Sequence, residues 1–129
     1  VSFEKDAAFR LDIPDMVGTW NVQSEGSVLL KGNDLGRKTH HAAGEFTTLK
    51  AEAVITKQQG RVLRGIFKSP KATENFVAVI GLDNKSFYYA DEDGSAHGNF
   101  VGKDKVEVIY RHVTAIDTVI AVGTWTRKK

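Results

Sequence analysis

The chain has 129 residues, of which 41% are hydrophobic and 26% charged, and its formal net charge is +2. This balance is typical of one globular domain that can bury a core, and so small a positive excess gives no reason to expect a nucleic-acid partner. The absence of cysteine excludes disulfide scaffolds, thiolate metal sites and cysteine nucleophiles. The apolar runs are too short to span a bilayer. We therefore expect one domain over residues 1–129, with no membrane span.

Residues 1–16 mix apolar and charged side chains without the alternation of a strand. Pro14 stops a helix from running through it and favours an extended Ile13. We expect a short helical or irregular segment, with a helical turn around residues 14–17, that acts as a lid or plug over one end of the domain. The chain begins at Val1 rather than at methionine, which leaves room for a signal peptide before it. We therefore expect a secreted or periplasmic protein in preference to a cytoplasmic one.

From Gly18 onward the sequence is a succession of β-rich runs separated by turn residues, without a sustained helical period. A polar, glycine-rich loop at 31–38 follows the first run, and most later links are short. Short links join antiparallel neighbours, because a parallel crossover needs a dozen or more residues. The eight predicted strands are 19–30, 44–58, 61–68, 74–82, 86–91, 95–101, 105–113 and 118–127.

A meander of eight strands either closes into a barrel or exposes two long edges. The sequence therefore predicts an all-β fold, an eight-stranded antiparallel up-and-down barrel. Such a barrel has an interior just wide enough for packed side chains or for one small ligand. Residues 17–20 (Val-Gly-Thr-Trp) recur at 122–125, and in a closed meander these two segments lie on neighbouring strands. The alternative is a coincidence among β-favouring residues.

The motif Gly18-Thr19-Trp20 after a short N-terminal turn, and the ending at 123–127, resemble the calycin superfamily of lipocalins, fatty-acid-binding proteins and avidins. The resemblance implies that Trp20 packs across the closed end of the barrel. It also implies that Arg127 lies over the indole ring and hydrogen-bonds the N-terminal segment, a cation–π contact worth roughly 0.5–2 kcal/mol. With two tryptophans and no cysteine, the chain departs from avidins and from many lipocalins. The resemblance therefore implies the fold and a barrel-closing role for Gly18, Trp20 and Arg127, but no particular ligand.

Tyr110 and His112 are the first candidates for a binding site. They follow Val106 and Val108 at a period of two, so all four side chains share one face of a strand. If that face points inward, it places a polar spot on an apolar wall, which is how small-ligand sites are usually built. His97, on the preceding predicted strand, is a further candidate. The alternative for each histidine is an exposed or internally satisfied side chain.

Arg64 and Tyr88 complete the candidate ligand-binding residues. An inward Arg64 would bind a carboxylate through two parallel hydrogen bonds, whereas an outward one is ordinary strand polarity. Tyr88 belongs to an aromatic run, 87–89, that supplies either a pocket wall or core. The pair at 40–41 points to opposite faces and does not share a metal ion, and the acidic turn at 91–94 lacks the distal glutamate of a calcium loop. We expect no metal and no cofactor.

No catalytic motif is present, so three hypotheses for the function stay open. The first is a lipocalin-like protein that holds a small apolar or amphipathic ligand in the barrel, without catalysis. The second is a structural or protein-interaction barrel that acts through its rim loop at 31–41 or as a homo-oligomer. The third is a small isomerase or hydrolase that uses His97, His112 and Tyr110 as acid–base groups.

Overall fold

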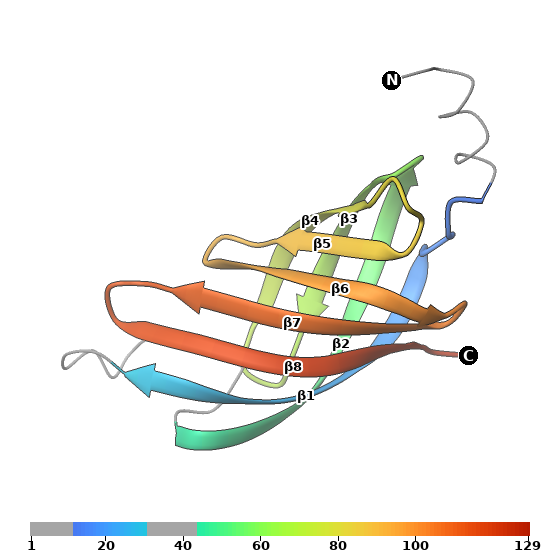
Figure 1. Cartoon of the computed structure of the whole chain (residues 1–129). Coiled ribbons are helices and arrows are strands. Elements are labelled where there is room, and N and C mark those ends of the chain that lie inside the picture. Colours follow the sequence, from blue (N-terminus) through green and yellow to red (C-terminus); the bar gives the residue numbers. More distant parts are fainter. Residues whose placement is uncertain (1–11, 31–43) are drawn as a thin grey trace.

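The computed structural model describes residues 12–30 and 44–129, and these form one closed antiparallel barrel in sequential strand order (Figure 1). The all-β, eight-stranded prediction is confirmed. Residues 1–11 and 31–43 lie outside the description, and with them most of the expected lid and the rim loop. The strands are β1 (Gly18–Leu30), β2 (Gly44–Gln59), β3 (Val62–Lys68), β4 (Thr73–Ile80), β5 (Ser86–Ala90), β6 (Gly94–Gly102), β7 (Lys105–Val113) and β8 (Asp117–Arg127).

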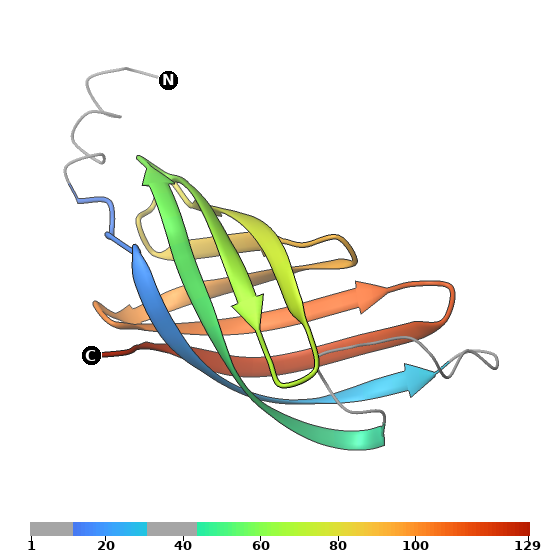
Figure 2. The same cartoon turned by 180° about the vertical axis from the view of Figure 1, so that it is seen from behind.

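The barrel closes where β1 pairs with β8, which places the two Val-Gly-Thr-Trp segments on neighbouring strands (Figure 2). Within each strand, inner and outer side chains alternate. In β7, Val106 and Val108 are buried, whereas Glu107 and Ile109 are exposed. This alternation follows from the pleat of an extended chain, and it decides which polar residues reach the interior. No helix among the described residues is long and apolar enough to cross a membrane.

One end of the barrel is closed by Trp20, which is fully buried. Its indole Nε1 donates a hydrogen bond of 2.9 Å to the carbonyl of Met16. The guanidinium carbon of Arg127 lies 4.4 Å from the centre of the Trp20 ring, and its nitrogens donate to the carbonyls of Asp15 and Val17. Gly18, the first residue of β1, has a φ of 128°, a value that residues with a side chain rarely adopt. These are the contacts that the calycin resemblance implied.

Residues 12–17 lie against the same end in an irregular conformation, so the expected helical turn around residues 14–17 is wrong. Gln58 on β2 fixes this segment: its side-chain oxygen accepts from the backbone N–H of Met16 at 2.8 Å, and its amide donates to the carbonyl of Pro14 at 2.8 Å. These tertiary bonds replace the local bonds of a helical turn, while the Met16 side chain is fully buried in the core.

Trp125 lies in a different part of the barrel from Trp20. It lies opposite Val22 on β1, one inward-facing pair further from the closed end, and its ring sits among other aromatic rings. The centres of Phe87, Tyr89 and Phe76 lie 5.2, 5.4 and 5.8 Å from it. Trp125 is therefore the centre of an aromatic core rather than a second closing residue.

Candidate functional site

The barrel contains a cavity at the end opposite Trp20. The space open to the centres of water molecules is about 50 Å³, enough for a few waters, so the interior is mostly filled by side chains. Four aromatic side chains form much of the wall: Phe67, Tyr89, Tyr110 and Trp125. Aliphatic side chains from four strands complete it: Val22, Leu49, Val108 and Val119. The cavity is narrow, and most of its wall is apolar.

Three carboxylates lie on the wall of this cavity: Glu74 near the start of β4, and Asp91 and Asp93 in the turn between β5 and β6. Asp91 is fixed, because its Oδ1 accepts the backbone N–H groups of Asp93 and Gly94 at 2.9 and 2.7 Å. Among the described residues that line the cavity there is no lysine or arginine. The site is therefore negatively charged wherever these carboxyl groups are ionised.

Glu74 is the acid most affected by this environment. Burial raises its pKa to about 7, and the charges of Asp91 and Asp93 act in the same direction. Burial, followed by the charge of Asp91, also raises the pKa of Tyr110 well above its ordinary value. Near neutral pH, Glu74 is therefore partly protonated, while the hydroxyl of Tyr110 keeps its proton.

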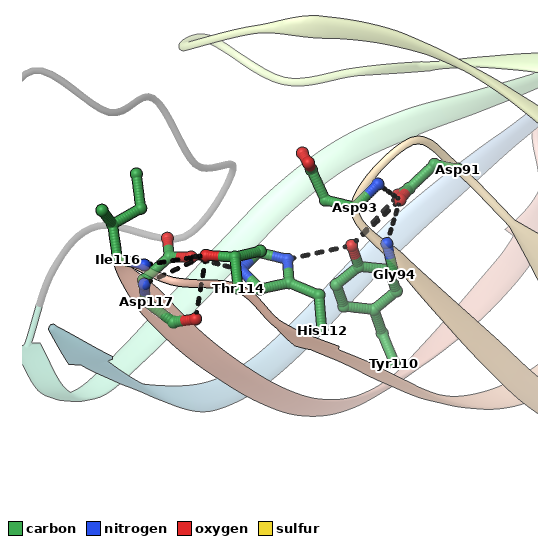
Figure 3. Close-up of polar contacts among 8 residues, drawn as sticks. All are labelled: Asp91, Asp93, Gly94, Tyr110, His112, Thr114, Ile116 and Asp117. Carbon is green, nitrogen blue, oxygen red and sulfur yellow. Dashed lines mark hydrogen bonds and ion pairs between the residues drawn. The ribbon is translucent and has the colours of Figure 1, made fainter. Parts of the chain in front are cut away.

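A chain of polar side chains runs from the carboxylates to the turn between β7 and β8 (Figure 3). The hydroxyl of Tyr110 donates to Asp91 Oδ2 at 3.0 Å and lies 3.1 Å from Nδ1 of His112. The other ring nitrogen of His112 lies 3.0 Å from Oδ1 of Asp117, which is 1% exposed. Thr114 donates its hydroxyl proton to the same oxygen at 2.7 Å. His112 is thus held on both sides.

The protons available to this series of polar side chains can be counted. Three contacts in series, Asp91 to Tyr110, Tyr110 to His112 and His112 to Asp117, need three protons if each is a hydrogen bond. A neutral phenol and a neutral imidazole supply two. These two groups therefore supply one proton fewer than three hydrogen bonds in series would need. The wall of the cavity is therefore a connected acid–base network rather than a set of isolated polar groups.

Tyr110 and His112 both lie on the inner face and line the cavity. Arg64, Tyr88 and His97 do not: all three are exposed on the outer face, so the expectation that they contribute to an interior site is wrong. The pleat explains the difference, because the inward positions of their strands are occupied by neighbours such as Leu63, Phe87 and Ala96. The proposed acid–base set of His97, His112 and Tyr110 is consequently not brought together.

Sequence reasoning missed Glu74, Trp125 and Asp117 as site residues, and it interpreted Asp91 and Asp93 only as part of a turn. Only the order of the strands could have pointed to these residues. Once β4, β5 and β6 are consecutive antiparallel strands, the start of β4 and the β5–β6 turn meet at one end of the barrel. That end is also where β7 ends and β8 begins, so strand order brings the acidic residues and His112 to the same end of the barrel.

The site shows no metal-binding arrangement: the part of the chain that the structure describes contains no group of three or more histidine, aspartate or glutamate side chains placed to hold a metal ion. No protein-family model matches the chain. No curated protein matches it either. Among solved structures, the chain is similar to the S-type phycobiliprotein lyase CPES from Guillardia theta, with 10% sequence identity, coverage of 98% of this chain and 97% of that one, and a TM-score of 0.35.

Proposed function

We propose that this protein binds a small amphipathic ligand whose slender apolar part enters the barrel and whose cationic head lies at Glu74, Asp91 and Asp93. The observation that carries the proposal is the combination of a largely apolar, aromatic-walled cavity with three carboxylates and no lysine or arginine among its described lining residues. An alkyl or small aryl amine has the matching chemistry.

The apolar wall provides the affinity. A methylene group that leaves water for such a wall contributes roughly 0.8 kcal/mol. Because Trp125 and the rings around it fill much of the interior, the site favours a narrow chain over a bulky ring system such as haem. The aromatic faces of Tyr89 and Trp125 also tolerate an adjacent positive charge.

The carboxylates provide the selectivity. A cation that approaches Glu74 relieves the repulsion among the three acids and favours the ionised form of each. An anionic head would add to that repulsion, and a neutral one would leave it in place. For ligands with the same chain, affinity is therefore expected to fall in the order amine, alcohol, carboxylate.

The test is calorimetric titration near pH 7 with hexylamine, hexanol and hexanoate, which share an alkyl chain and differ in the head group. We expect hexylamine to bind best, and to bind with release of a fraction of a proton from Glu74, seen as a heat that varies with the ionisation enthalpy of the buffer. Equal affinities for the three probes, or a preference for hexanoate, would contradict the proposal.

The variants Glu74→Gln and Asp93→Asn remove one carboxylate each and should each weaken hexylamine binding several-fold. Glu92→Gln is the matched control, because Glu92 lies in the same turn as Asp93 but is exposed and does not line the cavity. A control that weakens binding as much as Asp93→Asn would show a general effect of net charge rather than a site.

A further inference from the structure

The outer surface of the barrel carries a row of side chains that crosses six strands and is apolar at every position except His97 on β6. Directly paired positions on β3 to β8 place Val62, Val79, Tyr88, His97, Ile109 and Val122 side by side. The five apolar members are between 40% and 58% exposed. Exposed apolar side chains gathered in this way on a water-facing wall mark an interaction surface. We call these six residues the outer row.

An acidic and a basic side chain lie on opposite sides of the outer row. On β7, Glu107 lies two positions before Ile109 and Arg111 two positions after it, and all three point outward. Neither Glu107 nor Arg111 has an ion-pair partner within the described ranges 12–30 and 44–129; their cross-strand neighbours are Asn99 and Thr124, and Ser95 and Ile120. Both charges are therefore available to a partner.

We infer that a second copy of this chain packs on the part of the outer row around Ile109, through a two-fold axis that crosses β7 at right angles and passes Ile109. Such an axis reverses the direction of β7 in the partner, so Ile109 meets Ile109 and each Glu107 lies opposite an Arg111. Packed sheets stand about 10 Å apart, a gap that glutamate and arginine side chains bridge together. The wall formed by β5 to β8, at the front of Figure 1, would be the centre of the interface.

The placement of Glu107 and Arg111 favours a second copy of the chain over other partners. A symmetric dimer needs a patch that complements itself, and an acid and a base placed equally far from an apolar centre satisfy that condition. A partner with one sign of charge, such as an acidic peptide or a basic surface, would be attracted by one of the two residues and repelled by the other.

The experiment is sedimentation velocity from about 5 µM to about 500 µM, a range over which a reversible dimer changes its population. We expect the unmodified chain to dimerise. Glu107→Arg and Arg111→Glu should each weaken the dimer by about tenfold or more, because both inter-copy pairs become like-charged. The double variant, which exchanges the two charges, should dimerise like the unmodified chain.

A mixture of the two single variants provides the sharpest comparison. Glu107→Arg carries two arginines on its wall and Arg111→Glu carries two glutamates. Fluorescently labelled Glu107→Arg should therefore bind unlabelled Arg111→Glu more tightly than either variant binds itself. Lys71→Glu, an exposed change in the turn between β3 and β4, is the control for net charge and should leave the dimer unchanged.

Three results would overturn the inference. The first is a monomer over the whole concentration range. The second is a dimer that neither single charge reversal weakens or that their mixture does not restore. The third is a chain that remains monomeric in solution and instead co-sediments with phosphatidylcholine vesicles, which would assign the outer row to a lipid surface.

Discussion

The guanidinium group of Arg127 lies over the ring of Trp20, with its central carbon 4.4 Å from the ring centre, and joins the last strand to the first. The same group donates to two carbonyls of the segment that precedes β1. One side chain thus connects β8, β1 and the N-terminal segment at the closed end. Its effect is structural, because the cavity lies at the opposite end.

Replacing Arg127 with alanine should lower the free energy of unfolding by about 2–4 kcal/mol, from the lost cation–π contact, the lost charged hydrogen bonds to backbone carbonyls and the lost ion pair with Asp104. Urea denaturation measures this. Lys128→Ala is the matched control one residue away: Lys128 pairs with Glu52 at the exposed surface, so its loss should have almost no effect. A similar loss for both variants would argue against a special role for the contact over Trp20.

Glu74 should make stability fall with rising pH. Its pKa is about 7 in the folded barrel against 4.5 in the unfolded chain, so the folded state holds the proton more tightly. Its contribution is fully present below about pH 4.5 and is lost as the pH rises through about 7. We expect Glu74→Gln to remove about 1 kcal/mol of this pH dependence, a figure reduced because water partly screens the group. Urea midpoints at about pH 5 and about pH 8 test this, and an unchanged slope in the variant would contradict it.

The affinity for an alkylamine should change in the opposite direction. As the pH rises from about 6 to about 8, Glu74 ionises and attracts the cationic head, so hexylamine should bind roughly three- to tenfold more tightly. The same titrations on Glu74→Gln should give a much flatter pH profile. An affinity that falls over this interval would place the head group away from Glu74.

The pair His112–Asp117 should be a stability determinant, whereas His97 should not. His112→Leu leaves the buried carboxylate of Asp117 without its ring partner and should cost about 3–5 kcal/mol. The double variant His112→Leu/Asp117→Leu should cost less than the sum of the two single changes, because the uncompensated charge is removed with its partner. His97→Leu, on the outer face, should change stability by less than about 0.5 kcal/mol. Additive single and double effects would show that the two buried residues do not interact.

The strands and the closed end could be predicted from the sequence because their signals are local. Turn residues mark the strand ends, and Asp83 shows how: its Oδ1 accepts the backbone N–H groups of Lys85 and Ser86 at 2.9 and 2.8 Å, which fixes the β4–β5 turn. The inward direction of Tyr110 and His112 could also be predicted, because Val106 and Val108 define the buried face of their strand.

The rest of the site depends on information that is not local. The strand that holds Tyr88 has aromatic residues on both faces, and β3 has Val62 beside Leu63, so hydrophobicity does not reveal which face is inner. The carboxylates come together only through the order and register of β4, β5 and β6. Composition and periodicity cannot supply that register, and so they leave the acidic character of the cavity undetected.

The central claim, a cationic amphipathic ligand inside the barrel at the end opposite Trp20, is tested most directly by proton–nitrogen NMR of the two tryptophan indole groups. Trp125 lines the cavity, whereas the indole N–H of Trp20 is bonded to Met16 at the closed end. During titration with hexylamine, we predict that the Trp125 indole signal shifts in a saturable way while the Trp20 signal stays in place. A Trp125 signal that does not move up to the solubility limit of the amine, or a shift confined to Trp20, would contradict the proposed site.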